Sequence, residues 1–446
     1  MKAVIQAGGK GTRLWDITKD EIPKPMVPIL GKPLLEWQIE KCKENGITEI
    51  ILIIGHLGNC IREYFGEGTA WNVSVSYVEE REPLGTAGAF FDLKDMIGNE
   101  DFLMVYGDVF WDIDVSRMLR YHCEKHSLCT LFVHPNTHPF DSDLILQDES
   151  GRITGIDSKH NVRDYWYDNL VNAGLYVING QVCERVIKSE KVDLEKQIFR
   201  KMIEEGEAIY GYRSPEYIKD AGTVERLLTV EEEVRSGYTA SRNLQREQKC
   251  IFLDRDGTVN VKNGLVDTED KLMLEHCAAK AIKRINQSGY LAILVTNQPV
   301  VAKGMCTMEE VRNIHRKLTT LLGEEGAFLD DIAFCPHHPD IGFPGERPEY
   351  KFDCECRKPK TGLLMGFVEQ YHINLAESWM IGDTTRDMLT GNNAGTHTAL
   401  VLTGDAGKDG KYQAQIDLTC CDLLEAVECI LNNNGKQQNI SEEWRA

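Results

Sequence analysis

Residues 2–13 read KAVIQAGGKGTR, a short apolar run that leads directly into a glycine-rich loop. Glycines let backbone amides approach phosphate oxygens closely, and Lys10 and Arg13 add positive charge to the loop. The dinucleotide-binding fingerprint would need a glycine at Leu14, and a Walker loop would need Ser or Thr directly after Gly-Lys, where Gly11 stands. The loop therefore predicts a triphosphate site outside those two patterns, with a glycine-rich surface turn as the alternative.

Outside this loop, apolar β-branched segments alternate with amphipathic ones, which is typical of an α/β protein. Candidate strands of a first series lie at residues 3–5, 49–55, 73–78, 102–106, 128–133 and 171–178. After the polar stretch SGYTASRNLQREQ, a second series has candidate strands at 251–253, 291–295, 332–334 and 379–381. We therefore predict two α/β domains, with these bounds: an open sheet over 1–235, a linker over 236–248, a second domain over 249–431 and a polar tail over 432–446.

The composition limits the classes of partner. The chain has 446 residues, 42% of them hydrophobic, and a formal net charge of -20, so its average field repels nucleic acid and anionic membranes. The N-terminus lacks the features of a signal peptide, and the longest apolar runs are far below the ~20 residues of a membrane span. The 14 cysteines are scattered, which indicates reduced thiols. We therefore expect a cytoplasmic protein without a nucleic-acid or membrane partner, and its oligomeric state is left open, homo-oligomers included.

Charged residues after the glycine loop support a phosphate site. Lys24 stands between two prolines, which fix the backbone and can aim its ammonium at a phosphate. Asp108 follows a candidate strand at its carboxyl end, where open α/β sheets bind ligands. Asp108 could hold Mg²⁺, with Asp220 as a second candidate, although a single Asp after a strand is also a common turn residue.

Six motifs, taken in order, resemble those of the sugar-1-phosphate nucleotidyltransferase family: AGGKGTRL at 7–14, PKP at 23–25, PLGTAG at 83–88, GD at 107–108, NAG at 172–174 and DAGT at 220–223. The resemblance spans residues 1–235 and implies a Rossmann-like open sheet. It also implies a reaction in which a sugar phosphate oxygen attacks the α-phosphorus of a nucleoside triphosphate and releases pyrophosphate. Such chemistry depends on positioning and on cations more than on a protein nucleophile.

By this resemblance, Arg13 and Lys24 stabilise the developing charge, and Asp108 and Asp220 hold Mg²⁺. Further contacts with the nucleotide and the sugar phosphate are implied for Gly8, Gly9, Gly11, Thr12, Gly85, Gly88 and Lys159. The sequence departs from the family at that lysine, since the usual Glu-Lys-Pro reads Ser-Lys-His. Gln6 replaces the leucine common before Ala-Gly-Gly, close to the base site, so the identity of the base cannot be carried over.

The second series opens with IFLDRDGT at 251–258, which places Asp254 and Asp256 two residues apart just beyond a strand. One carboxylate can attack phosphorus while the other moves protons. A phosphate dianion repels a carboxylate nucleophile, so the site also needs cations. Suitable cations, metal ligands, hydroxyls and amides follow in TNQ at 296–298, CRKP at 356–359 and GDTTRD at 382–387.

In this order, the four pieces resemble the motifs of the haloacid dehalogenase phosphatases, over residues 249–425. The resemblance implies that Asp254 is the nucleophile and becomes an aspartyl phosphate, and that Asp256 is the general acid and base. It further implies that Asp383 binds Mg²⁺ beside Asp254 and the backbone carbonyl of Asp256. Contacts with the phosphoryl group or the rest of the substrate are implied for Thr296, Asn297, Arg357 and Lys358. The alternative is an Asp-Gly turn with unrelated turn residues.

A cluster of cysteines and histidines lies between these motifs, with Cys335, His337 and His338 in one group and Cys354 and Cys356 in another. Three thiolates and one imidazole suit tetrahedral Zn²⁺, and four protein ligands leave no position for water, so we expect a closed structural site. Buried cysteines beside a surface histidine are the alternative. His338 could replace His337, although the family pattern favours His337.

This zinc loop narrows the resemblance to the histidinol-phosphatase and heptose-bisphosphatase branch, and CPHHP and CRKP are especially similar to the heptose enzymes. Removal of the distal phosphate from a sugar bisphosphate would leave the anomeric phosphate that a nucleotidyltransferase uses. We therefore expect consecutive steps in the synthesis of a nucleotide-activated heptose for surface polysaccharide, from D-glycero-D-manno-heptose 1,7-bisphosphate and, by family analogy, GTP.

Two alternatives remain open at this point. TNQPVVAKG at 296–304 departs from the heptose pattern, because Lys303 replaces an arginine and a bidentate fork is lost. The same two activities on mannose, polyol or glycerol phosphates, with CDP- or GDP-linked products, would accommodate that change. The other alternative is that one half is a regulatory module without turnover.

Overall fold

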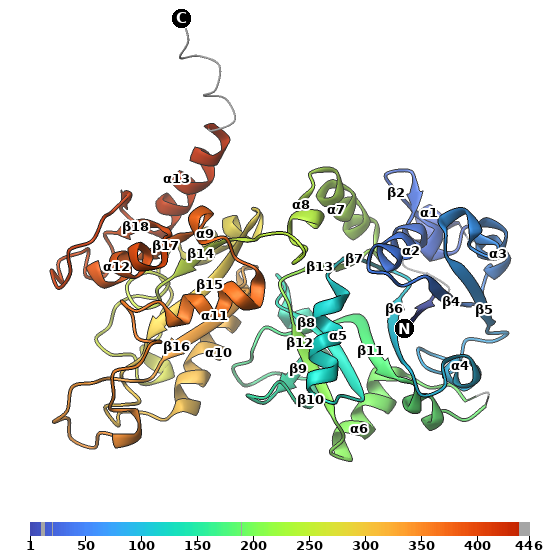
Figure 1. Cartoon of the computed structure of the whole chain (residues 1–446), viewed down its shortest axis with the longest axis horizontal. Helices are drawn as coiled ribbons and strands as arrows, with labels where there is room; N and C mark the ends of the chain where they lie inside the picture. Colours follow the sequence, from blue (N-terminus) through green and yellow to red (C-terminus); the bar gives the residue numbers. More distant parts are fainter. Residues whose placement is uncertain (10–13, 20, 189, 437–446) are drawn as a thin grey trace, which may run out of the picture. The chain divides into compact units, whose positions relative to one another are not determined.

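The computed structural model describes residues 1–9, 14–19, 21–188 and 190–436. The predicted loop residues Lys10, Gly11, Thr12 and Arg13 lie outside the described residues. The chain forms two compact units (Figure 1). The first comprises residues 1–134, 143–158 and 170–245, and the second comprises 135–142, 159–169 and 246–446. Within the described ranges, no helix is both long enough and apolar enough to cross a membrane.

The first unit is built on a mixed nine-stranded sheet. Its strands are β1 (Lys2–Gln6), β4 (Glu49–Ile54), β5 (Ser74–Glu79), β6 (Asp101–Tyr106), β8 (Cys129–His134), β9 (Leu144–Gln147), β10 (Ile153–Asp157), β11 (Val171–Asn179) and β12 (Ile209–Arg213). The main path runs β10-β9-β11-β6-β1-β4-β5, and β8 pairs with β11 and β12. Strand β1 is parallel to β4 and β6, whereas β11 is antiparallel to β6.

Short strand pairs and helices complete the first unit. The pairs are β2 (Pro28–Ile29) with β3 (Lys32–Pro33), and β7 (Val109–Asp112) with β13 (Tyr217–Asp220). The helices are α1 (Trp15–Thr18), α2 (Leu34–Glu44), α3 (Gly58–Phe65), α4 (Phe90–Ile97), α5 (Val115–Glu124), α6 (Arg200–Glu204), α7 (Val224–Arg235) and α8 (Tyr238–Ser241).

Both faces of the first sheet are buried. Side chains alternate between the faces along a strand, so Ala3 and Ile5 of β1 belong to one apolar cluster and Val4 belongs to another. All three are fully buried. A central strand covered on both sides reads as a continuous apolar run, which is the pattern that predicted this strand.

The second unit has a six-stranded parallel sheet, in the order β16-β15-β14-β17-β18-β19. Its strands are β14 (Lys249–Leu253), β15 (Tyr290–Asn297), β16 (Asp331–Cys335), β17 (Trp379–Gly382), β18 (His397–Val401) and β19 (Leu418–Cys420). Its helices are α9 (Ala278–Asn286), α10 (Met308–Glu324), α11 (Gly362–Tyr371), α12 (Thr385–Ala394) and α13 (Leu423–Lys436). The mixed sheet and the parallel sheet confirm the predicted fold class, two α/β domains.

Two segments of the second unit, residues 135–142 and 159–169, interrupt the first unit in the sequence. The amide of Tyr167 donates to the hydroxyl of Thr320 at 3.1 Å, and the hydroxyl of Thr319 donates to the Tyr167 carbonyl at 2.9 Å. Both threonines belong to α10. From the sequence, these segments are predicted within 1–235, because they lie between strands of the first sheet and have no periodicity that indicates α10 as their partner.

The packing of Pro139 on α10 requires a glycine at position 323. A Cβ atom added to Gly323 would lie 2.5 Å from Cγ of Pro139. We therefore expect Gly323→Ala to lower the free energy of unfolding of the second unit by about 1–3 kcal/mol, visible in calorimetry as a lower melting temperature. Gly366 of α11 is the matched control, because an added Cβ atom there meets nothing within 4 Å. Gly366→Ala should be neutral or stabilising, and equal melting temperatures for the two variants would contradict the close packing.

Candidate active sites

In the first unit, the predicted lysine meets the first predicted magnesium ligand. Lys24 opens a short 3-10 turn that ends at Met26. Its ammonium forms an ion pair with Asp108, and the Lys24 side chain is 10% exposed. Asp108 comes two residues after the end of β6, and the preceding Gly107 approaches β1 so closely that a Cβ atom would lie 2.7 Å from the carbonyl oxygen of Gln6. The ion pair therefore lies at the carboxyl edge of the sheet, where α/β sheets bind ligands.

The second predicted magnesium ligand, Asp220, approaches Asp108 through the backbone. The amide of Ala221 donates to the Asp108 carbonyl at 2.8 Å. The Asp220 carboxylate pairs with Arg226 at 2.6 Å and accepts from the amide of Gly222. In the described part of the chain, Asp108 and Asp220 do not belong to a group of three potential metal ligands. Magnesium binding by these residues stays a prediction, and Arg226 is a partner that the sequence analysis missed.

The glycines of the PLGTAG motif allow close packing of the backbone. Gly85 has a φ of +85°, and a Cβ atom there would lie 2.3 Å from the carbonyl oxygen of Val192. At Gly88, a Cβ atom would lie 2.2 Å from Cβ of Leu84. The amide of Ala87 donates to the Val192 carbonyl at 3.0 Å, which ties the loop to that segment. These contacts explain both glycines without a ligand, and their predicted contact with nucleotide and sugar stays a prediction.

Three further predicted residues have different surroundings. Lys159 belongs to the second unit, where its ammonium lies 3.3 Å from Asp141 and its side chain is 41% exposed. In the first unit, Gly8 is partly buried and Gly9 is exposed. Binding of the sugar phosphate by Lys159 stays a prediction.

The sequence analysis missed a polar cluster beside the NAG motif. Oε1 of Glu195 accepts from the hydroxyls of Tyr106 and Tyr176, both at 2.7 Å, and from the Asn172 amide at 3.3 Å. Burial raises the pKa of Glu195. Tyr106 comes two residues before Asp108, so hydroxyl, amide and carboxylate groups that can bind sugar hydroxyls lie next to the predicted metal ligand in the chain. Only Asn172, in its motif, signalled this cluster in the sequence.

In the second unit, a buried lysine joins two buried carboxylates. The Lys358 ammonium lies 2.8 Å from Asp254 and 2.6 Å from Asp387. Burial opposes the charge, but Asp254 and Asp387 raise the pKa of Lys358, so this side chain carries a proton. Burial, followed by repulsion from Asp387, raises the pKa of Asp254. Asp387 stands four residues after Asp383 in the quoted GDTTRD motif, a spacing that could have indicated its role.

Asp383, the predicted magnesium ligand, completes a group with Asp254 and Asp387 whose ligand oxygens lie within 4.8 Å of one another. Its Oδ1 atom is buried and has no hydrogen-bond partner among the described residues. Its Oδ2 atom accepts from the amide of Asp405 at 2.7 Å. Burial and the nearby Asp254 raise the pKa of Asp383 to about 7. A divalent cation would satisfy the unpaired oxygen and reduce the repulsion, so these residues fit Mg²⁺.

The carboxylate of Asp256 is surrounded by hydrogen-bond donors. Arg255 donates from Nε at 3.1 Å and from Nη2 at 3.0 Å, Gln298 donates at 2.9 Å and Asn260 at 3.1 Å. Burial opposes ionisation, but Arg255 and the two amides keep the pKa of Asp256 below its usual value. Arg255 is fully buried and lies 3.2 Å from Nε2 of His315. The sequence analysis missed this network, because it treated Arg255 as a spacer between two aspartates.

The other predicted phosphoryl contacts are Thr296, Asn297 and Arg357. Thr296 is buried at the end of β15. The side chain of Asn297 binds the backbone of Lys358 in both directions, each at 3.0 Å. Arg357 donates to the carbonyl of His337 at 2.9 Å. Asn297, at the end of β15, thus holds the backbone of Lys358 in place. The preceding residue, Arg357, is bonded to the loop that carries the cysteines and histidines.

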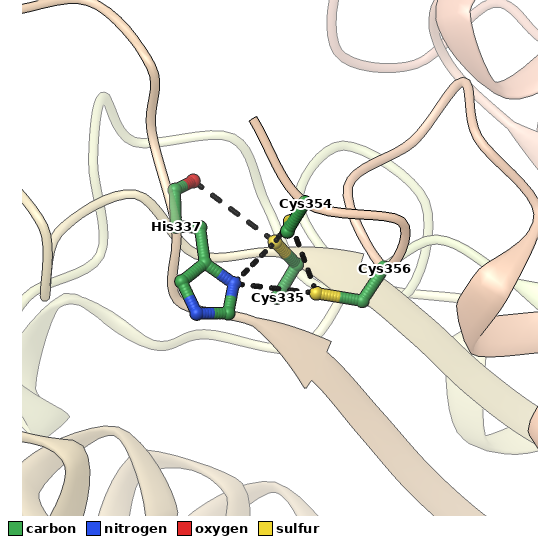
Figure 2. A group of neighbouring side chains, drawn as sticks. All are labelled: Cys335, His337, Cys354 and Cys356. Carbon is green, nitrogen blue, oxygen red and sulfur yellow. Dashed lines mark hydrogen bonds between the residues drawn. The ribbon is translucent and has the colours of Figure 1, made fainter. Parts of the chain in front are cut away.

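The four predicted zinc ligands converge on one another (Figure 2). Sγ of Cys354 lies 3.4 Å from Sγ of Cys335 and 3.2 Å from Sγ of Cys356. Nδ1 of His337 lies 3.6 Å from Sγ of Cys335 and 3.3 Å from Sγ of Cys356. Four ligand atoms this close to one another can share one metal ion, and three thiols with one imidazole are typical ligands of Zn²⁺, so the cluster is consistent with a zinc site.

His337 and His338 should differ in zinc binding. Nδ1 of His338 accepts from the amide of Asp340 at 3.2 Å, whereas His337 faces two of the thiols. We expect His337→Ala to lower the zinc content per chain, measured by elemental analysis after dialysis, because one of four ligands is lost. His338→Ala is the matched control and should keep its zinc. The opposite result would assign the imidazole ligand to His338.

Burial should make His315 a source of acid sensitivity. Burial lowers the pKa of His315 to about 3, whereas an exposed histidine has a pKa of ~6.5. Between these values the unfolded state binds more protons, so the free energy of unfolding falls as the pH falls. At pH 5 the loss from this residue should be about 2 kcal/mol. Calorimetry should show a smaller loss of stability between pH 7 and pH 5 in His315→Gln than in the unchanged protein, and equal losses would contradict the assignment of this sensitivity to His315.

Each unit carries a set of candidate site residues, in the first unit typical of nucleotidyltransferases and in the second typical of phosphatases with an aspartate nucleophile. Comparisons with known proteins agree: residues 2–237 match the family model described as nucleotidyl transferase, and residues 355–426 match the one described as HAD-hydrolase-like. The chain belongs to the nucleotidyl transferase family, and its second part belongs to the haloacid dehalogenase phosphatases that include heptose bisphosphate phosphatases.

Three relatives illustrate these similarities. The D-glycero-beta-D-manno-heptose-1,7-bisphosphate 7-phosphatase of Pasteurella multocida is 38% identical over 184 residues, which are 41% of this chain and 97% of that protein. The mannose-1-phosphate guanylyltransferase of Mycobacterium tuberculosis is 31% identical and covers 50% of this chain, with 61% of that protein matched. The UTP–glucose-1-phosphate uridylyltransferase of Synechocystis is 29% identical and covers 47% of this chain, with 57% of that protein matched.

These similarities confirm both predicted enzyme classes and both resemblances drawn from the motifs. The chain has nucleotidyltransferase and haloacid dehalogenase phosphatase activities, and its substrates are sugar phosphates and nucleotides. The names of the two relatives of the first unit give different nucleotides and different sugars. The comparisons therefore do not assign the nucleotide or the sugar that this chain uses.

Proposed function

We propose that this chain is a bifunctional enzyme of nucleotide-sugar biosynthesis that acts on D-glycero-D-manno-heptose 1,7-bisphosphate and GTP. The second unit removes the distal phosphate, and the first transfers the nucleotidyl group to the remaining sugar 1-phosphate and releases pyrophosphate. The observation that carries the proposal is the joining, in one chain, of a nucleotidyltransferase to a phosphatase that matches 97% of a heptose 7-phosphatase. The product would serve the synthesis of a surface polysaccharide.

In the phosphatase reaction, Asp254 attacks phosphorus and the bond to the sugar oxygen breaks, which forms an aspartyl phosphate. Asp256, once protonated, gives its proton to the departing sugar oxygen, which its lowered pKa favours, and later takes one from the water that hydrolyses the intermediate. Lys358, buried beside Asp254, offsets the repulsion between the carboxylate and the phosphate dianion. Mg²⁺ held by Asp254, Asp383 and the backbone carbonyl of Asp256 would supply further charge neutralisation. Thr296, Asn297 and Arg357 bind the phosphoryl group and its surroundings.

In the nucleotidyl transfer, the sugar phosphate oxygen attacks the α-phosphorus, and pyrophosphate leaves. Lys24 stabilises the developing charge together with Arg13, and the pairing of Lys24 with Asp108 supports this role. Asp108 and Asp220 would hold Mg²⁺, which neutralises phosphate charge. The glycine loop, Gly85, Gly88 and Lys159 bind the nucleotide and the sugar phosphate.

The chemistry of the two reactions sets their order. A 7-phosphatase leaves the anomeric phosphate in place, and a nucleotidyltransferase requires a sugar 1-phosphate as its nucleophile. The phosphatase product is thus the transferase substrate. Zn²⁺ held by the four-residue cluster has a structural role, because its four protein ligands leave no position for water.

A second set of substrates, mannose, polyol or glycerol phosphates with GDP- or CDP-linked products, is favoured by Lys303. This residue stands where the heptose pattern has an arginine, and its ammonium lies 4.4 Å from the ring centre of Phe343. A lysine cannot form the bidentate contacts of an arginine. The 31% identity to a mannose-1-phosphate guanylyltransferase also supports this alternative.

Variants at the two sites test whether both halves turn over. The substrates are heptose 1,7-bisphosphate and each nucleoside triphosphate in turn. Asp254→Asn should lower the rate of phosphate release by at least ~1,000-fold, since the nucleophile is lost. Lys24→Ala should lower pyrophosphate release from sugar 1-phosphate by about 100-fold and leave phosphate release intact. Asp353→Asn and Lys201→Ala, at exposed side chains, are the matched controls. Unchanged rates in either site variant would contradict the assignment of that site, and release from mannose or glycerol phosphates alone would select the second set of substrates.

A further inference from the structure

Three potential metal ligands of different chemical types meet where two helices of the second unit begin. His276 and Cys277 directly precede α9, and Asp422 directly precedes α13. An imidazole nitrogen, the thiol sulfur and a carboxylate oxygen of these residues all lie within 4.8 Å of one another. The reaction proposed for the phosphatase and the cluster shown in Figure 2 use none of the three, so their convergence needs its own explanation.

The packing of α9 and α13 in one apolar cluster fixes the position of the thiol. Cys277 is 5% exposed and belongs to the same cluster as Leu423, the first residue of α13. Burial raises the pKa of the Cys277 thiol, and hydrogen bonds from the amides of Leu424 and Leu423 oppose the rise. The sulfur therefore lies at the first turn of α13, close to Asp422.

Asp422 is oriented through one of its two carboxylate oxygens. Its Oδ1 atom accepts from the amide of Glu425 at 2.9 Å and so caps the N-terminus of α13. Its Oδ2 atom lies 3.9 Å from Nε2 of His276, which is too long for a hydrogen bond. A hydrogen bond that orients one oxygen of a carboxylate is a common support for metal binding by the other oxygen.

A second histidine–aspartate pair of the same unit shows what the thiol adds. Nδ1 of His397 lies 3.9 Å from Oδ2 of Asp417, the same separation as between His276 and Asp422. Among the residues that the structure describes, no third ligand joins His397 and Asp417 in a group of potential metal ligands. A partly exposed pair of this kind is a weak ion pair. Cys277 therefore distinguishes the cluster at the start of α9 and α13 from an ordinary surface pair.

We propose that His276, Cys277 and Asp422 bind a thiophilic divalent cation, Zn²⁺ above all, which joins the start of α9 to the start of α13. A combination of nitrogen, sulfur and oxygen ligands favours Zn²⁺ over Mg²⁺, which prefers oxygen ligands alone. The thiol binds as a thiolate and releases its proton to solvent. Water completes the coordination, because the chain supplies three ligands. The His276 side chain is 78% exposed, so the cation reaches this site directly from solvent.

Calorimetric titration with Zn²⁺ measures the affinity of this site. The full chain first receives one equivalent of Zn²⁺, which fills the cluster of Figure 2, and excess Mg²⁺, which fills the predicted magnesium sites. The unchanged protein should then bind one further equivalent of Zn²⁺. Asp422→Asn should weaken that binding by at least about 10-fold, because asparagine keeps the helix cap but loses the charged ligand. His397→Gln is the matched control and should bind the further equivalent with unchanged affinity.

Cobalt shows whether sulfur is a ligand. Co²⁺ added to the same zinc-loaded protein should produce the charge-transfer absorption of a thiolate bound to cobalt, and Cys277→Ser should lose it. Serine suits the N-cap position that Cys277 occupies, so this variant should keep its melting temperature without added metal. His276→Gln should also weaken binding of the further equivalent by at least about 10-fold, at an exposed position where folding is unaffected.

Three results would overturn the proposal. The first is that the unchanged protein binds no further equivalent of Zn²⁺. The second is that Co²⁺ binds without the absorption of a thiolate complex. The third is that Asp422→Asn and His276→Gln bind the further equivalent as tightly as the unchanged protein, which would indicate adventitious binding elsewhere on the surface.

Discussion

The second unit depends on the charge balance around one buried lysine. Lys358 lies within 2.8 Å of Asp254 and 2.6 Å of Asp387, and Asp383 belongs to the same group of carboxylates. Three carboxylates this close together in a low-dielectric interior would repel one another strongly if all were ionised. The ammonium offsets part of that repulsion, and the unpaired oxygen of Asp383 leaves room for a divalent cation to offset more. The backbone contacts of Asn297 hold the lysine in place.

In the first unit, two carboxylates at the predicted site are each balanced by a separate cation. Asp108 is matched by Lys24, and Asp220 is matched by Arg226, each at the end of a strand. Glu80 differs from these two, because its Oε1 atom is buried without a hydrogen-bond partner among the described residues. Groups with incomplete bonding at the carboxyl edge of a sheet are those that a ligand can complete.

The inserted segments show how a short contact can change the apparent domain limits. Residues 135–142 and 159–169 lie between strands of the first sheet in sequence, yet Tyr167 bonds to two threonines of α10 and Pro139 packs on its Gly323. These contacts depend on the backbone groups of Tyr167 and on the absence of a side chain at Gly323. Neither leaves a periodic pattern, which is why strand and helix periodicity could not indicate them.

The amino-acid sequence by itself determined the two α/β sheets, the order of the motifs at their strand ends, and the cysteines and histidines of the candidate metal cluster. These features are encoded locally, by apolar periodicity, by glycines and by paired cysteines. Only the tertiary structure decided that Asp387 shares Lys358 with Asp254, that Arg255 and His315 stand behind Asp256, and that Gln6 meets Glu80. Each of these pairs joins separate strands, loops or helices, and the distance between two side chains is set by how those elements pack, a quantity that no local pattern in the chain contains.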